Sequence, residues 1–264
     1  MIFKNTALSV IIPTYNSANT LAVCLDSIMN QTFKDLQVLV IDGSSDDKTL
    51  EIVERYAGLH QSVSYISEKD KGVYDAMNKG IKLAKGEWIY FMGSDDTFYC
   101  NDAVESVLSG NLSNDDVIYG DVFSNMLGGI YDGEFTVSKL FEKNICHQAI
   151  FFRKSVFKLT GLFDTRFKAH ADWLHNLKWF SDHRIRKRYV NKIIANFSEG
   201  GLSSSHKDVF FEHVMNWERA KHYKKETSRI NRLRVAKAVL KDALANNYTR
   251  QFFKIIAGIP SFIF

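Results

Sequence analysis

Proline and cysteine are scarce in this chain. Its 264 residues include two prolines, Pro13 and Pro260, and three cysteines, Cys24, Cys100 and Cys146. So few prolines exclude a proline-rich linker. No CxxC pair is present, which argues against a zinc ribbon or a thioredoxin-like redox site. The odd, widely spaced cysteines fit a reducing compartment.

Long apolar runs are also missing. No stretch of 18 or more apolar residues occurs, so the sequence predicts no transmembrane helix. Residues 1–6 lack the apolar core and cleavage site of a signal peptide. Hydrophobic residues make up 45% of the chain and charged residues 24%. These are ordinary globular values, which exclude a disordered chain and a fibrous repeat.

The net charge of +4 is unevenly distributed along the chain. Residues 206–264 contain 12 Lys and Arg against 5 Asp and Glu, which leaves −3 for the preceding 205 residues. This asymmetry predicts a catalytic domain at residues 1–205 and a basic helical extension at 206–264.

Strands and helices are expected to alternate through the first 96 residues. Short β-branched or apolar runs predict strands at 8–12, 36–41, 63–66 and 88–92. Apolar residues at helical spacing predict helices at 19–31, 47–56 and 73–84. The alternation predicts an α/β fold, with a largely parallel sheet and helices on both faces.

The second half of the sequence is less regular. It predicts strands at 116–121, 145–152 and 189–197, and helices at 170–180 and 210–245. The strand at 145–152 contains an unusual His147-Gln148 pair, and the last helix is long and basic.

Small polar and acidic residues follow every predicted strand of the first half. They are Thr14-Tyr15-Asn16, Asp42-Gly43-Ser44-Ser45, Glu68 to Gly72, and Ser94-Asp95-Asp96. Ligands of parallel sheets collect at the carboxyl ends of the strands. The sequence therefore predicts a polar ligand site at this edge.

The Ser94-Asp95-Asp96 segment is the strongest local signal. Adjacent carboxylates repel each other unless a cation neutralises them. Oxygen ligands suit Mg²⁺ or Mn²⁺, which clamp phosphate oxygens. The alternative is a solvated turn.

Asp42, with Ser44 beside it, has two interpretations. An acid after the second strand can hydrogen-bond a ribose or a base edge. Alternatively the segment caps the next helix through Asp46 or Asp47. Both can hold, because several acids are present.

The helix after Gly72 carries Asp75, Asn78 and Lys79 at i, i+3 and i+4, so the three are expected to share a face. Such a face could hold a sugar and a phosphate, or it could be the solvated side of an amphipathic helix. Taken singly, His147 fits a core residue and Asp172 fits a surface charge or cap.

The order of these motifs resembles the family 2 glycosyltransferases with a GT-A fold, over about residues 7–205. The stretches 71–80 and 146–152 further resemble the bacterial branch that builds O-antigen, capsule and exopolysaccharide.

The resemblance implies a role for each matching position. Asp172 would be the catalytic base, and Asp96 and His147 would ligate Mn²⁺ or Mg²⁺. Gly200 to Ser203 would form a mobile loop near the acceptor. The nucleotide-sugar would be bound by Pro13, Thr14, Tyr15, Asn16, Asp42, Ser44, Lys71, Gly72, Asp75, Asn78, Lys79, Ser94 and Asp95.

The implied activity is inverting sugar transfer in surface polysaccharide biosynthesis. A UDP-hexose or UDP-N-acetylhexosamine would react with a hydroxyl of a saccharide on polyprenyl diphosphate, giving a β-linkage. An inactive sugar-nucleotide-binding scaffold is one alternative. A nucleotidyltransferase is another, although it should show a glycine-rich basic loop after the first strand, which residues 14–17 lack.

The basic extension predicts a partner. Val235, Ala238, Val239 and Leu240 can form an apolar stripe, and residues 252–264 are strongly apolar. A basic amphipathic helix suits an anionic membrane surface, here the cytoplasmic face of the inner membrane. The alternative is packing on the catalytic domain or on a second copy, which leaves a homodimer open. The acidic body argues against nucleic acid.

Overall fold

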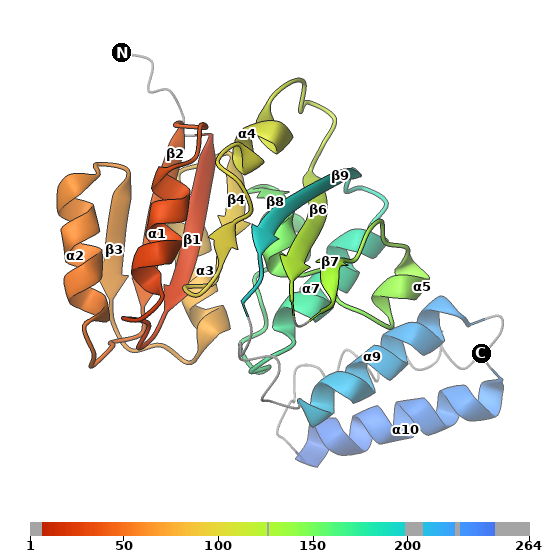
Figure 1. Ribbon diagram of the computed structural model, residues 1–264. Helices are drawn as coiled ribbons and strands as arrows, with labels where there is room; N and C mark the ends of the chain where they lie inside the picture. The colour runs from red at the N-terminus through yellow and green to blue at the C-terminus, as the bar shows by residue number, and fades with distance from the viewer. Residues whose placement is uncertain (1–6, 126, 199–207, 225–227, 246–264) are drawn as a thin grey trace. The chain divides into compact units, whose positions relative to one another are not determined.

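Residues 7–125, 127–198, 208–224 and 228–245 are described by the computed structural model. By its contacts the chain divides into two units, residues 1–205 and 206–264, and each is described by itself. The first unit is a mixed sheet with helices on both faces, and the described residues of the second form a helix pair (Figure 1).

The first unit follows the predicted alternation of strands and helices. Its strands are β1 Leu8–Thr14, β2 Leu36–Asp42, β3 Val63–Ser67, β4 Trp88–Phe91, β5 Thr97–Phe98, β6 Val117–Ser124, β7 Gly129–Tyr131, β8 Ile150–Arg153 and β9 Lys187–Asn196. Its helices are α1 Leu21–Met29, α2 Thr49–Leu59, α3 Val73–Leu83, α4 Ala103–Leu108, α5 Val137–Leu140, α6 Val156–Thr160 and α7 Ala171–Ser181, with a 3₁₀ turn η1 at His147–Ala149.

The strand order confirms the predicted α/β sheet. β3, β2, β1 and β4 are parallel neighbours, with Thr14 opposite Asp42 and Asp42 opposite Ser67. From β4 onward the order is β8, β6, β9, β5; β8 is antiparallel to both of its neighbours, while β6 and β9 are parallel. The sheet is therefore parallel on its first side and mixed on its second.

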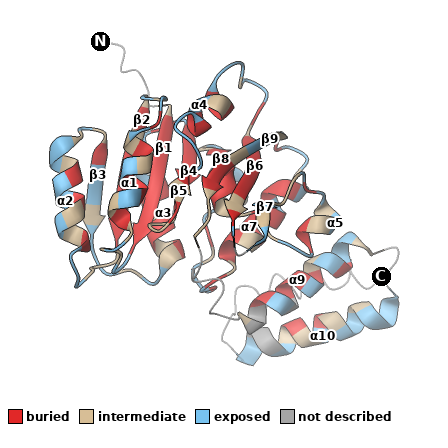
Figure 2. Cartoon of the chain, viewed as in Figure 1, coloured by how far each residue is buried: buried red, intermediate tan, exposed pale blue. Residues whose placement is uncertain are grey.

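The helices bury both faces of the central strands β1, β2, β4, β6 and β8, which are mostly red in Figure 2, whereas the edge strand β3 is largely exposed. On one face α1, α2 and α4 pack against Leu8, Val10 and Ile12 of β1 and against β2 and β4. On the other face α3 packs so closely that a Cβ at Gly80 would lie 2.3 Å from Ile11 Cγ2. The apolar side chains on each face are thereby removed from water, and this burial is the main favourable term in folding.

An aromatic cluster extends the second face beneath β8 and α7. Phe152 lies edge-on to Trp179 at 5.9 Å, and His175 stacks on Phe157 at 5.1 Å. Burial lowers the pKa of His175 to about 3, so this histidine packs as a neutral ring.

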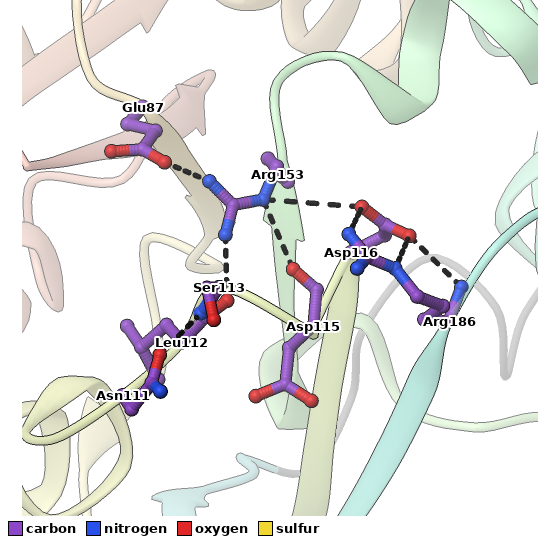
Figure 3. A network of polar contacts seen from close by, with 8 residues as sticks. All are labelled: Glu87, Asn111, Leu112, Ser113, Asp115, Asp116, Arg153 and Arg186. Carbon is purple, nitrogen blue, oxygen red and sulfur yellow. Dashed lines mark hydrogen bonds and ion pairs between the residues drawn. The ribbon is translucent and has the colours of Figure 1, made fainter.

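An arginine network ties together the strand ends at the opposite edge from the predicted site (Figure 3). Arg153, at the end of β8, donates to the Asp115 and Leu112 carbonyls at 3.0 and 2.8 Å and pairs with Glu87. Arg186 forms a two-pronged pair with Asp116 at 2.9 and 3.0 Å. Two parallel N–H···O bonds fix geometry as well as energy, so the network sets the register of β6 against β9.

Two predicted elements are wrong. Residues 145–152 are not one strand, because His147, Gln148 and Ala149 form η1 and β8 begins at Ile150. Residues 210–245 are not one helix: in the described residues α9 covers Val209–His222 and α10 covers Arg229–Ala245.

The second unit has a small core of its own. Trp217 and Ala220 of α9 are buried against Ala236 and Val239 of α10, with Val235 and Leu240 packed at the side. The predicted apolar stripe therefore packs on a neighbouring helix. In the described ranges no helix combines the length and hydropathy needed to cross a bilayer. The apolar end at 252–264 lies outside the described residues.

Candidate active site

The carboxyl ends of β1, β2, β3 and β4 place the predicted polar residues along one edge of the first unit. Pro13 and Thr14 are buried as the last residues of β1, whereas Tyr15 is 63% exposed.

The loops after β1 and β2 hold each other. Asn16 donates its N–H to Ser45 Oγ at 2.9 Å, and its side-chain oxygen accepts the Asp46 N–H at 3.0 Å. Asn16 and Ser44 have positive φ angles of 49° and 64°, a backbone conformation that residues other than glycine rarely adopt. The crossed hydrogen bonds keep both residues in this conformation.

Asp42 organises the second loop. Its carboxylate is fully buried and accepts hydrogen bonds from the Ser45 N–H, the Ser45 hydroxyl and the Ser67 hydroxyl at 3.1, 2.5 and 2.6 Å. The predicted contact with a nucleotide would have to reach a carboxylate that is 0% exposed and already accepts three hydrogen bonds. The alternative capping role belongs to Asp47, which accepts the Thr49 N–H of α2 at 2.9 Å.

Tyr15 and Asp70 flank Gly43. A Cβ at Gly43 would lie 2.9 Å from Asp70 Oδ2 and 3.4 Å from a ring carbon of Tyr15. A side chain at position 43 would therefore displace one of them. Sequence reasoning placed Asp70 in the right motif but gave it no role, since nothing local shows that it reaches β2.

The start of α3 is a charged corner. Asp75 accepts the Lys71 N–H at 3.1 Å, and Asp70 accepts the N–H of Gly72, whose φ of 110° favours glycine. Lys79 Nζ lies 3.0 Å from Glu68 and 3.9 Å from Asp75. One cation therefore serves two acids here.

Asn78 does not belong to this corner, so the predicted shared face is wrong at this residue. Its side chain is buried, donates to the Phe163 carbonyl at 2.8 Å and accepts the Phe163 N–H at 2.9 Å. The position i+3 lies at the border of the helix face, and packing against residue 163 turned it inward.

The turn after β4 curls back on itself. A Cβ at Gly93 would lie 2.9 Å from Asp95 Oδ1 and 2.3 Å from Asp96 Oδ2. Ser94 Oγ lies 2.8 Å from Ser17 Oγ, which joins this turn to the loop after β1. A residue larger than glycine at 93 would push both carboxylates away.

Asp96 is a buried carboxylate beside a second one. One of its oxygens accepts the Gln148 amide N–H at 2.5 Å and the other accepts the Ser198 N–H at 2.8 Å. Burial raises its pKa first of all, and the charge of Asp95 raises it further, while these donors and His147 act in the opposite direction. Its ionised form is therefore held at a cost in free energy.

Gln148 is a site residue to which sequence reasoning assigned no role, beyond its place in the unusual His147-Gln148 pair. Its backbone carbonyl accepts the Tyr90 hydroxyl and its side-chain nitrogen serves Asp96. Its side-chain oxygen is buried and accepts no hydrogen bond in the described part of the chain. An unpaired acceptor beside two acids is a further oxygen donor for a cation.

Asp172 opens α7 and is almost fully buried. One oxygen accepts the Tyr74 hydroxyl at 2.7 Å, and the other accepts the Asn144 amide at 2.9 Å with His147 Nδ1 at 3.7 Å. Burial is the largest influence and raises its pKa, but His147 and Tyr74 outweigh burial, so the pKa lies below its ordinary value. Asp172 is therefore ionised at neutral pH.

The side chain of Asn144 is itself fixed by hydrogen bonds from the core. Its side-chain oxygen accepts from Asn176 at 2.9 Å, and Asn176 in turn accepts the indole N–H of the buried Trp179 at 2.8 Å. The chain of hydrogen bonds runs from the core to Asp172, which fixes the carboxylate's orientation.

His147 Nδ1 lies 3.7 Å from the Asp172 carboxylate. The charge of His147 acts on the pKa of Asp96 and on that of Asp172, so residues from β4, η1 and α7 converge. The η1 turn, rather than the predicted strand, directs His147 to this place.

The paired acids fit a divalent cation by their chemistry. Asp95 raises the pKa of Asp96, and a cation would relieve that repulsion. The described residues contain no group of three or more His, Cys, Asp or Glu arranged as metal ligands, so a cation here would need oxygens from a ligand as well. The predicted loop at 200–203 lies outside the described residues.

Comparisons with known proteins identify the family of the chain. Residues 9–128 match the family described as Glycosyl transferase family 2. A PGL/p-HBAD biosynthesis glycosyltransferase of Mycobacterium bovis is 40% identical over 208 residues, covering 77% of this chain and 81% of that protein. The chondroitin synthase of Escherichia coli is 28% identical over 239 residues, which cover 87% of this chain and 33% of the synthase.

Solved structures share the fold. TarS 1-349 of S. aureus, in complex with UDP-GlcNAc, aligns with a TM-score of 0.65 at 22% identity, covering 81% of this chain and 66% of that one. The mannosyltransferase PcManGT of Pyrobaculum calidifontis, in complex with GDP-Man and Mn²⁺, aligns at 0.59 with 20% identity, covering 90% and 75%.

Proposed function

Because the chain belongs to glycosyl transferase family 2, we propose that it moves a sugar from a UDP-sugar to an acceptor hydroxyl with inversion. The observation that carries the proposal is the position of η1, where His147 Nδ1 lies 3.7 Å from Asp172 and the neighbouring Gln148 donates to Asp96 at 2.5 Å. Asp96 lies on a strand-end turn that suits a diphosphate, and Asp172 is ionised and held by Tyr74, Asn144 and His147.

The donor would lie along the loops after β1 and β2. The exposed Tyr15 ring and Asp70, on either side of Gly43, suit a base and its ribose. Lys71 and Lys79 bring positive charge to the diphosphate side. Ser94 and Asp95 would complete the ribose and phosphate contacts. UDP-hexose and UDP-N-acetylhexosamine both fit this proposal.

We assign the cation to Asp96, with Asp95 and the unpaired oxygen of Gln148 nearby. Bound Mn²⁺ or Mg²⁺ would neutralise charge on the departing diphosphate. His147 would complete the shell of the cation or the diphosphate.

Asp172 is the proposed base. A carboxylate offers about four lone pairs; the Tyr74 hydroxyl and the Asn144 amide each take one, and His147 Nδ1 lies 3.7 Å away. One of the remaining lone pairs takes the proton of the acceptor hydroxyl as that oxygen attacks the anomeric carbon. The nucleoside diphosphate leaves from the opposite face, so an α-linked donor gives a β-linked product.

The acceptor we propose is a saccharide on polyprenyl diphosphate, in surface polysaccharide biosynthesis. The relatives support a biosynthetic role, since one is named for PGL/p-HBAD biosynthesis and another is a chondroitin synthase. Such an acceptor would bring the reaction to the cytoplasmic face of the inner membrane.

The first test is a donor screen. The purified full-length chain is heated with Mn²⁺ and each of several UDP- and GDP-sugars, and release of the nucleoside diphosphate is measured in parallel. A UDP-sugar at 100 times its Kd should raise the melting temperature by roughly 5 °C or more. Slow release of UDP should accompany it. Binding without any release would instead favour the scaffold alternative, and no stabilisation by any nucleotide-sugar contradicts both.

Replacing Tyr74 by phenylalanine tests the hold on Asp172. The change removes the donor 2.7 Å from the carboxylate, so the pKa of Asp172 should rise and the acid limb of the pH–kcat profile should move to higher pH. Hydrogen bonds to charged groups contribute about 1.5–3 kcal/mol, so the acid limb should move by roughly one to two pH units while the KM for the donor changes little.

Tyr65→Phe is the matched control. Tyr65 lies on β3, is 38% exposed and contacts Glu54 at 3.4 Å, away from Asp172. The Tyr65→Phe change should leave the acid limb of the pH–kcat profile unmoved. An unmoved acid limb in Tyr74→Phe would show that this hydroxyl does not act on the base.

A further inference from the structure

Helix α10 has two different faces. The buried face carries Ala236 and Val239, which pack against Trp217 and Ala220 of α9. The opposite face is exposed over the full helix. At 100° per residue, six of its residues fall within an arc of about 100°, and they form what we call the basic-aliphatic stripe: Ile230, Leu233, Arg234, Lys237, Lys241 and Leu244.

The aliphatic residues of the stripe are unusually open to water. Ile230 is 64% exposed, Leu233 45% and Leu244 60%. The three extend over about 21 Å of helix at 1.5 Å per residue. Single exposed leucines are common, but three aligned on one face indicate a surface that is covered in use.

The charges of the stripe are all of one sign. In the described part of the chain, no ion pair joins Arg234, Lys237 or Lys241 to an acid. The one acid of α10, Asp242, falls about 120° from Ile230 around the helix. The stripe is therefore complementary to an anionic surface.

We propose that the basic-aliphatic stripe binds the surface of an anionic lipid bilayer. Ile230, Leu233 and Leu244 enter the boundary between headgroups and acyl chains, and the three cations lie at the lipid phosphates with their aliphatic stems buried. The interface is a different one from the stripe predicted by sequence, because Val239 and its neighbours are occupied by α9.

The alternation of aliphatic and basic residues favours lipid over nucleic acid. A phosphate backbone would pair with the cations but would leave the three aliphatic side chains in water. A bilayer accommodates both kinds of group at once, since its headgroups and acyl chains lie within one side-chain length of each other.

Vesicle sedimentation with the full-length chain tests the proposal. Wild type is expected to sediment with vesicles of equal parts phosphatidylglycerol and phosphatidylcholine, and much less with phosphatidylcholine alone. Each basic residue near an anionic surface contributes about 1 kcal/mol, so the triple change Arg234→Gln, Lys237→Gln, Lys241→Gln should weaken binding on the order of 100-fold. Ile230→Ser, Leu233→Ser, Leu244→Ser should weaken it at least tenfold at unchanged charge.

The control removes the same charge from the first unit. Lys82→Gln, Lys85→Gln, Lys158→Gln changes three exposed lysines away from the stripe, and it should bind within about twofold of wild type. If the triple serine variant binds vesicles like wild type, the stripe does not enter the bilayer and the proposal is wrong. Equal loss in the control, or tighter binding to single-stranded RNA than to vesicles, would also overturn it. Release of UDP in the donor screen needs no vesicles, so the two proposals fail separately.

Discussion

Replacing Asp172 by asparagine is expected to lower kcat by about 10²–10⁴-fold, the usual contribution of a general base. The amide cannot take the acceptor proton, although its size and position match the carboxylate. Donor binding, measured by calorimetry without acceptor, should stay within about threefold. Retention of near wild-type kcat would remove Asp172 from the mechanism.

The same variant should be less stable at neutral pH. The folded state holds the pKa of Asp172 below its ordinary value, so the ionised side chain favours folding above the ordinary pKa of about 3.9. That contribution is lost as pH falls through the lowered folded pKa. The difference in melting temperature between wild type and Asp172→Asn should therefore shrink in acid.

Asp96→Asn is expected to have opposite effects on activity and stability. Loss of the carboxylate that would hold the cation should lower kcat by about 100-fold or more, since Lewis-acid stabilisation contributes several kcal/mol. The metal-free protein should melt about 2–4 °C higher, which corresponds to roughly 1 kcal/mol for a unit of this size. Differential scanning calorimetry in EDTA measures the gain.

The expected increase in melting temperature follows from the raised pKa of Asp96. Burial and Asp95 make its ionisation unfavourable in the folded state, so the folded protein becomes less stable as pH rises through the ordinary aspartate pKa toward the raised one. Asparagine cannot ionise, so the variant avoids the free-energy cost of a buried charge. The difference in melting temperature between Asp96→Asn and wild type should therefore vanish in acid.

Asp121→Asn is the matched control for that gain. Asp121 is also buried, but it accepts from the Gly133 N–H and the Tyr189 hydroxyl at 2.8 and 2.9 Å, away from Asp95. It should bring no increase in melting temperature. A loss of stability in Asp96→Asn equal to that in Asp121→Asn would mean that Asp96 is not held at a cost.

The first half of the fold could be predicted because it is local. Apolar runs with a period of 2 or 3.6 lie next to each other in the sequence, and β1, β2 and β3 pair in parallel as expected. The acids at the strand ends followed from the same pattern, since parallel strands bring their carboxyl ends together.

The partners of those acids could not be predicted. Gln148 reaches Asp96 across 52 residues and Tyr74 reaches Asp172 across 98, and no local pattern encodes such contacts. Asn78 shows the converse error, because helix spacing predicted an outward face and packing against Phe163 turned the residue inward. For His147, an apolar neighbourhood suggested a strand where the backbone makes a 3₁₀ turn.

β9 can join the sheet only when nearly the whole first unit has been synthesised. It pairs with β6 on one side and β5 on the other, and Asn196 donates to Thr97 across 99 residues. At 5–20 residues per second, the ribosome needs roughly 5–20 s to make the intervening chain. The Ser198 N–H on Asp96 comes later still. The parallel half can therefore fold on the nascent chain well before the hydrogen bonds to the acidic turn are complete.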